Sequence, residues 1–135
     1  MGIDFYIAAD IAALNQGNPI LLTLENDAYY WFLYRYFESA NLDRSRELIG
    51  LYGEGALEGY QLDRLEDQMK EALLDIYGRP DTWNVLVGWK SHPRCRATED
   101  WQPIEKLKAV ELVQRILGLA QKARDSGLKL VFLGD

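Results

Sequence analysis

The sequence predicts one α+β domain over residues 1–135, with a small, mostly antiparallel sheet and about three helices packed on it. Two long segments repeat apolar residues at spacings of three and four, which is typical of amphipathic helices. Several short segments are apolar or alternate in polarity, as strands do. No repeat, linker or low-complexity tract divides the chain, so the pattern favours a single α+β domain.

The N-terminal part of the chain predicts two strands and the start of a helix. Residues 3–8 alternate in polarity and residues 20–25 form a short apolar run, so both are predicted strands. The stretch 14–19, LNQGNP, has the composition of a turn. Asn26 and Asp27 are favourable N-caps, and we expect a helix in the aromatic-rich stretch that follows them.

The middle of the chain combines a glycine-rich segment with a strong helical pattern. Residues 48–52 are predicted to form a short strand followed by a loop, because the glycines from 50 to 59 break any long helix. From Tyr60 to Tyr77 apolar residues recur at helical spacing. We expect this helix to end at GRPD, residues 78–81, since neither glycine nor proline continues a helix easily.

The C-terminal part predicts a strand, a polar loop, a long helix and a last strand. In residues 82–90, Trp83, Val85, Val87 and Trp89 alternate and are predicted to share one face. Residues 91–103 have the composition of a polar loop, and Pro103 suits the first turn of a helix. This helix is predicted to include Leu107 in its apolar stripe and to end near Ser126, with Gly127 as a C-cap. A final strand is predicted over residues 128–133.

Composition restricts the class of protein. The only cysteine is Cys95, so no disulfide can form within the chain. The N-terminus has no basic lead, Asp4 and Asp10 interrupt its apolar run, and no segment approaches the ~20 apolar residues of a membrane span. We therefore expect a cytoplasmic protein that does not contact a membrane.

Charge is distributed unevenly along the chain. Residues 1–81 carry 15 acidic and 6 basic side chains, a net charge of −9, whereas residues 82–135 carry 6 acidic and 9 basic ones, a net charge of +3. Their sum is the −6 of the whole chain. Because nucleic-acid binding needs a basic footprint, we expect no nucleic-acid partner and favour a basic protein partner.

The stretch AYYWFLYRYF, from Ala28 to Phe37, holds seven of the 16 aromatic residues. A helical wheel places most of them on one face, which we expect to enter the core. Trp31, Tyr34 and Arg35 point the other way, with a cation–π contact available between Trp31 and Arg35. Either a second element covers this face, or it is an exposed patch for a protein partner, since Trp, Tyr and Arg are enriched at interface hot spots.

A ladder of four carboxylates runs along the helix predicted for residues 60–77. Its members are four residues apart and face away from the leucine stripe: Asp63, Asp67, Glu71 and Asp75. Like charges at this spacing oppose the helix by about 0.2–0.5 kcal/mol per pair, while Glu66 and Lys70 form a favourable pair. The ladder is either a solvated outer face or an acidic strip for a basic partner.

Motifs for catalysis, cofactors and metals give little support to an enzyme. The glycines of residues 50–59 match neither a Walker loop nor a dinucleotide fingerprint, and one histidine with one cysteine excludes a Cys/His zinc site within the chain. We expect no cofactor and no metal. The remaining candidate is the 91–103 loop, where Arg94 and Arg96 flank a possible reactive thiol; its site residues are His92, Arg94, Cys95 and Arg96.

Four stretches resemble small uncharacterised bacterial α+β proteins and, in general plan, immunity proteins that neutralise toxins. They are LENDAYYWFL (24–33), LYG (51–53), WNVLVGW (83–89) and LVFLGD (130–135). None of them is a catalytic signature. The resemblance implies a stand-alone cytosolic bacterial protein that acts by binding.

The leading expectation is therefore a non-enzymatic protein-binding module, such as an immunity-type inhibitor of a toxin, with an acidic and aromatic surface. Its candidate residues are Trp31, Tyr34, Arg35, Asp63, Asp67, Glu71 and Asp75. The alternative is a small-ligand-binding protein or enzyme with a site in the 91–103 loop. A third possibility is a homodimer whose seam buries Trp31 and Tyr34.

Overall fold

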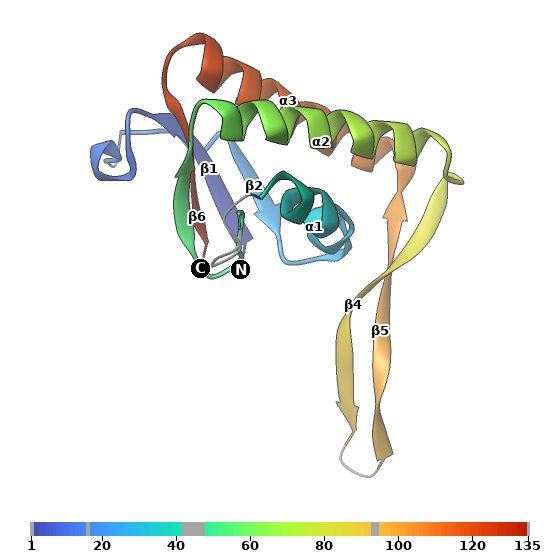
Figure 1. Ribbon diagram of the computed structural model, residues 1–135. Coiled ribbons are helices and arrows are strands. Elements are labelled where there is room, and N and C mark those ends of the chain that lie inside the picture. Colours follow the sequence, from blue (N-terminus) through green and yellow to red (C-terminus); the bar gives the residue numbers. More distant parts are fainter. Residues whose placement is uncertain (1, 16, 42–47, 93–94, 135) are drawn as a thin grey trace.

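The computed structural model describes residues 2–15, 17–41, 48–92 and 95–134, and for residues 90–92, 95 and 96 it describes the backbone alone. This part of the chain contains three α-helices, a short 3-10 turn and two antiparallel sheets, one of four strands and one of two (Figure 1). The predicted α+β class with about three helices is confirmed.

The larger sheet has the strand order β2-β1-β6-β3, and each neighbouring pair is antiparallel. Its strands are β1 (Gly2–Ala8), β2 (Leu22–Glu25), β3 (Glu54–Leu57) and β6 (Lys129–Gly134). Phe5 pairs with Leu22 on one side and with Phe132 on the other. Paired residues share a face, so these buried side chains form one apolar face of the sheet.

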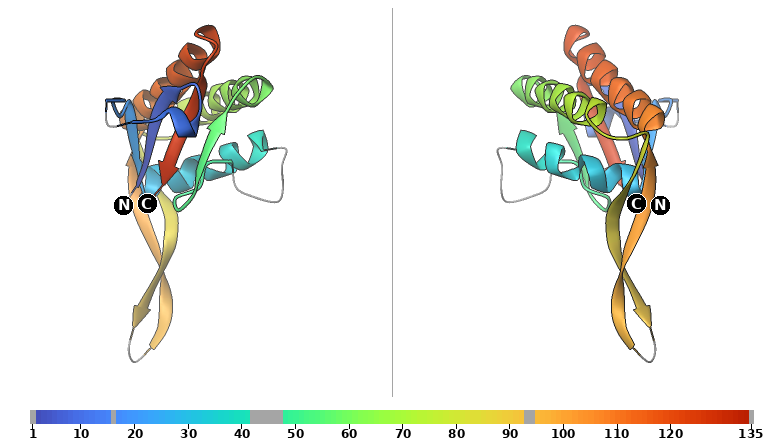
Figure 2. Two further views of the ribbon diagram at one scale, coloured as in Figure 1. Left: turned by 90° about the vertical axis from the view of Figure 1, so that its left-hand side faces the viewer. Right: turned by 90° about the vertical axis from the view of Figure 1, so that its right-hand side faces the viewer.

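The helices supply the rest of the core. They are α1 (Ala28–Ala40), α2 (Tyr60–Tyr77) and α3 (Lys106–Asp125). α2 and α3 lie side by side, and α1 packs against α2 and against β2 (Figures 1 and 2). The predicted stripe of α2 is buried at five positions, Leu62, Leu65, Met69, Ala72 and Ile76. The prediction that Leu107 belongs to the apolar stripe of α3 is wrong, because this residue lies in the first turn and is 83% exposed.

Two helix ends follow the predicted local chemistry. The Asp27 carboxylate accepts a 2.9 Å hydrogen bond from the backbone N–H of Tyr29 and caps the start of α1. Gly127 follows α3 with φ +67°, and the N–H of Leu128 donates to the carbonyl of Ala123 at 2.9 Å. This is a Schellman ending, in which glycine supplies the left-handed conformation at no steric cost.

The smaller sheet is a long, twisted hairpin that projects from the body of the molecule (Figures 1 and 2). It consists of β4 (Thr82–His92) and β5 (Cys95–Glu105), and we call residues 82–105 the hairpin arm. At its base Trp83 pairs with Ile104, which is fully buried, and both strands contact α1. Farther out, within the described part of the chain, the two strands have only each other as sheet partners.

The arm corrects the prediction for the C-terminal part of the chain. Residues 91, 92 and 95–103 are strand, so the predicted loop over 91–103 is wrong for these residues, and α3 begins at Lys106 instead of Pro103. Pro103 lies in β5 opposite Asn84. A strand with an open edge tolerates proline because its missing N–H can face away from the partner strand. Apart from the buried Ile104, most of the described side chains of β5 are exposed, so the strand lacks the apolar alternation that marks a half-buried strand.

The strand predicted over residues 48–52 is also wrong, since the structure has bends and a turn there and places β3 at Glu54–Leu57. Gly55 explains the position of β3. A Cβ at this residue would lie 2.7 Å from the ring of Phe132 on β6. The glycine therefore lets the two strands pair while a large aromatic ring occupies the space above them.

Candidate protein-binding site

The aromatic stretch of α1 divides between core and partly covered surface. Phe32, Leu33 and Phe37 are buried, as the helical wheel predicts. Tyr30, which the wheel places at the border, is 1% exposed, and its hydroxyl donates to the carbonyl of Ile49 at 3.0 Å. Most of the stretch therefore serves the core.

Trp31 and Tyr34 are half-buried and lie against the core. The Trp31 Nε1–H donates to Asn26 Oδ1 at 3.0 Å, and the indole meets the Tyr34 ring at a centroid distance of 5.6 Å. The predicted cation–π contact is wrong, because the Arg35 guanidinium lies over the rings of Phe32 and Tyr36, at 5.5 and 5.0 Å from their centroids. Contacts within the chain thus cover much of the α1 face that carries Trp31, Tyr34 and Arg35.

The carboxylate ladder splits into paired ends and a free centre. Asp63 accepts a 3.0 Å hydrogen bond from Arg124, and Asp75 is held by Arg35 and by Arg79, the latter at 2.9 Å. Asp67 and Glu71 are exposed, and within the described ranges neither has a hydrogen bond or ion pair. Only two of the four predicted carboxylates therefore remain for a partner.

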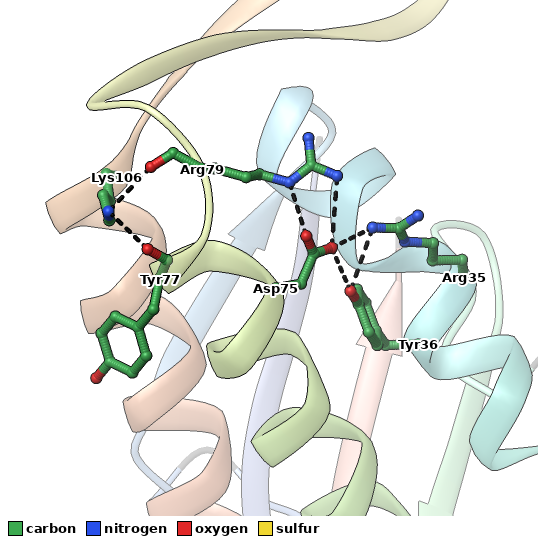
Figure 3. A network of polar contacts seen from close by, with 6 residues as sticks. All are labelled: Arg35, Tyr36, Asp75, Tyr77, Arg79 and Lys106. Atoms are coloured by element: carbon green, nitrogen blue, oxygen red, sulfur yellow. Dashed lines mark hydrogen bonds and ion pairs between the residues drawn. The ribbon is translucent and has the colours of Figure 1, made fainter.

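Asp75 is the centre of a network that joins α1 to the end of α2 (Figure 3). Its carboxylate accepts hydrogen bonds from Arg79, from Arg35 and from the hydroxyl of Tyr36. Burial opposes ionisation of Asp75, but the hydrogen bonds from Arg79 and Tyr36 prevail and lower its pKa. Burial, reinforced by the Asp75 carboxylate, raises the pKa of Tyr36 to about 12. The network therefore favours an ionised Asp75 and a neutral Tyr36.

This network predicts a loss of stability at high pH. In the unfolded chain Tyr36 releases its proton near its ordinary pKa of 10.0, whereas in the folded chain the pKa is about 12. The folded state thus holds the proton more tightly, so the contribution of Tyr36 is complete below pH 10 and falls as pH rises from 10 to 12. Difference absorbance of phenolate between the wild type and Tyr36→Phe measures this ionisation. Asp75→Asn should lower the pKa of Tyr36; ionisation of Tyr36 near pH 10 in the wild type would contradict the prediction.

A β-bulge sorts the side chains of the hairpin arm onto its two faces. Leu86 pairs with Trp101, but the next pair is Gly88 with Asp100, so Val87 is an extra residue on β4. Beyond the bulge Trp89 pairs with Glu99, which lies two residues from Trp101 on the same strand. Since residues two apart on a strand share a face, Trp89 lies on the face of Leu86 and Trp101.

The bulge overturns the prediction that Trp89 shares a face with Trp83 and Val85. Those two residues point toward the body, and both pack against the core. Leu86, Trp89 and Trp101 lie on the opposite face and are 37%, 64% and 52% exposed. We call these three residues the arm cluster. The Trp101 Nε1–H donates to Glu99 Oε2 at 2.7 Å, which adds an acidic group to the cluster.

The base of the arm is anchored by aromatic and cationic contacts. The ring of Phe32 on α1 meets Trp83 edge to face at a centroid distance of 5.4 Å. The Arg79 guanidinium lies over both rings, 5.0 Å from the centroid of Phe32 and 5.2 Å from that of Trp83. Lys106 Nζ donates to the carbonyls of Tyr77 and Arg79 (Figure 3). These contacts fix the direction in which the arm leaves the body.

The alternative site falls at the tip of the arm. Arg94 lies outside the described residues, and for His92, Cys95 and Arg96 the structure describes the backbone alone. Within the described ranges, no cluster of three or more His, Cys, Asp or Glu side chains fits a metal ion. The same residues include no helix of the length and apolarity that a membrane span requires.

Comparison of the chain with protein-family models, with curated proteins and with solved structures gave no match.

Proposed function

We propose that this chain is a non-enzymatic protein-binding module that contacts its partner through the hairpin arm. The observation that carries the proposal is the arm cluster: two tryptophans and a leucine exposed on one face of a strand pair that stands away from the body. Tryptophan is among the residues most enriched at interface hot spots. Exposed tryptophans on a projecting element therefore point to a partner that buries them.

The architecture of the arm supports this proposal independently of its composition. A two-stranded hairpin is marginally stable in water unless it packs on something, and beyond its base the arm has only its own two strands. In the described sheet β4 and β5 are both edge strands, and an edge strand is a place where a partner strand can pair. A partner that covers the arm cluster supplies the missing packing.

Charge indicates the chemistry of the partner. The chain has a net charge of −6, Glu99 borders the arm cluster, and Asp67 and Glu71 are exposed on α2. A basic protein surface complements this distribution, mainly by increasing the rate of encounter. The resemblance to immunity proteins suggests the particular form of this proposal, in which the partner is a toxin and the arm blocks it by binding.

The test measures the affinity of an identified partner for two variants. Protein captured from a lysate of the source organism is identified and purified, and its dissociation constant is measured with the wild-type chain. We expect Trp89→Ala and Trp101→Ala each to weaken binding about 30-fold. Tyr60→Ala removes an aromatic residue that is 63% exposed at the start of α2, and it should leave the affinity unchanged.

Two outcomes would contradict the proposal. One is wild-type affinity in the variant that carries both tryptophan substitutions, with an unchanged circular dichroism spectrum. The other is a chain that sediments as a dimer and becomes a monomer on the same substitutions, because the arm would then bind a second copy of the chain instead of a basic partner.

A further inference from the structure

A pocket of about 470 Å³ lies between the start of α1, the segment 50–54 and β6. It shares no lining residue with the hairpin arm. Its volume falls within the range of about 300–1,000 Å³ that is typical of small-molecule sites. The pocket is therefore large enough to hold a ligand with an aromatic ring.

Four aromatic residues of the described part of the chain line the pocket, and contacts within the chain hold the Trp31 ring in place. Trp31 and Tyr52 line it together with Tyr30 and Phe132, both of which are almost fully buried. The Trp31 indole donates its N–H to Asn26 and meets the Tyr30 ring edge to face at a centroid distance of 5.0 Å. The only polar group of the indole is thus already satisfied, and the ring is oriented before a ligand arrives.

The segment 50–54, which forms another wall of the pocket, is hydrogen-bonded to β6. The backbone N–H of Gly134 donates to the carbonyl of Gly53 at 2.7 Å. A Cβ at Gly134 would lie 2.3 Å from the carbonyl oxygen of Leu51, so only glycine permits this close approach. The backbone of this wall is therefore held against the end of β6.

The charges of the lining residues determine which ligands of suitable size the pocket can bind. Among the residues that the structure describes, those lining the pocket include Glu54 and no Lys, Arg or His. Glu54 is exposed and has no hydrogen bond or ion pair within the part of the chain that the structure describes. These described lining residues offer a phosphate or carboxylate ligand no cationic partner, whereas they offer an ammonium group a carboxylate and the faces of aromatic rings.

We infer that this pocket binds a small arylalkylammonium compound, with the ring between Trp31 and Tyr52 and the ammonium group against Glu54. Aromatic faces attract both an apolar ring and a cation. A charge-assisted hydrogen bond to Glu54 then selects the amine over a neutral molecule of the same shape. The site is a second binding function, separate from that of the arm.

The test compares three indole probes that differ chiefly in charge: tryptamine, the neutral alcohol tryptophol and the anion indole-3-propionate. Binding is followed by the NMR signal of the Trp31 indole N–H, assigned with Trp31→Phe, and by calorimetry. We expect tryptamine to bind about tenfold more tightly than tryptophol, and indole-3-propionate to bind more weakly than either. Tyr52→Ala, at a residue that is 71% exposed, should weaken all three probes without unfolding the protein.

The Glu54→Gln variant tests whether the Glu54 carboxylate causes the preference for tryptamine over tryptophol. It should remove the preference for tryptamine, whereas Glu71→Gln, which makes the same change in net charge on an exposed helix face, should preserve it. Equal binding of tryptamine and tryptophol to the wild type, or an unchanged preference in Glu54→Gln, would overturn the inference. So would the absence of a Trp31 shift with every probe at millimolar concentration.

Discussion

Phe32→Ala should lower the free energy of unfolding by about 3–5 kcal/mol, the usual cost of removing a buried phenylalanine ring. Phe32 is 6% exposed on α1, packs edge to face on Trp83 and lies beneath the guanidinium of Arg79. Its loss leaves a cavity where α1, the end of α2 and the base of the arm meet. Urea unfolding followed by circular dichroism gives the change in free energy. Because small domains are stable by only about 5–15 kcal/mol, this single change removes a large part of the total.

Phe32→Leu separates packing from the aromatic contacts. Leucine keeps most of the buried apolar area but loses the edge-to-face contact and the cation–π contacts with Arg35 and Arg79. We expect this variant to lose about 1–2 kcal/mol. The Trp83 indole signal should broaden in it, because the base of the arm is less firmly held. A loss as large as that of Phe32→Ala would mean that ring-specific contacts, and not the filled volume, dominate at this position.

The sequence correctly predicts those elements in which the burial of one face gives a periodic spacing of apolar residues. α2 and β1 each bury one face, so their apolar residues recur at spacings of three and four, or of two. Asp27 and Gly127 mark helix ends because a cap needs a particular side chain or a positive φ. These signals are local, and the structure agrees with them.

The second strand of the arm, β5, lacks such a periodic pattern. Most of the described side chains of β5 are exposed, so the strand buries no continuous apolar face and its composition is that of a loop. The bulge at Val87 reverses the faces of β4, and alternation alone cannot reveal a one-residue shift. Gly88 was the available signal, because an isolated glycine within a strand pattern often marks a bulge. If the bulge is placed at this glycine and β5 is recognised as a strand, the sequence also predicts that Trp89 and Trp101 share one face of the arm.

The predicted acidic surface shows what helical spacing cannot predict about a binding site. Helical spacing correctly places Asp63 and Asp75 on the surface of α2, but of their partners only Arg79, four residues after Asp75, is near in sequence. Arg124 is 61 residues from Asp63, and Arg35 is 40 residues from Asp75. Only the tertiary fold brings these charges together, so spacing alone cannot distinguish a free carboxylate from a paired one.

Arg124 also forms the most buried ion pair of the described residues. Its guanidinium donates to Glu66 Oε2 at 2.7 Å, and the Glu66 side chain is 7% exposed. The predicted pair between Glu66 and Lys70 is therefore wrong: Glu66 faces α3, whereas Lys70 is exposed. The second oxygen of Glu66 is buried and accepts no hydrogen bond within the described part of the chain. Burying a carboxylate that is only half satisfied costs free energy that one ion pair often fails to return.

Glu66→Met should consequently raise the free energy of unfolding by about 1–3 kcal/mol, because an apolar side chain of similar volume replaces a poorly satisfied buried charge. Arg124 keeps Asp63 as an ion-pair partner at 3.0 Å, so the substitution strands no cation. Arg124→Ala should act in the opposite direction and destabilise the protein, since it leaves the Glu66 carboxylate buried and unpaired. Thermal and urea unfolding of both variants and of the double variant measure these changes. Adding Glu66→Met to Arg124→Ala should restore stability, because no buried charge then remains. A destabilised Glu66→Met protein would instead show that the ion pair between α2 and α3 contributes more than its desolvation costs.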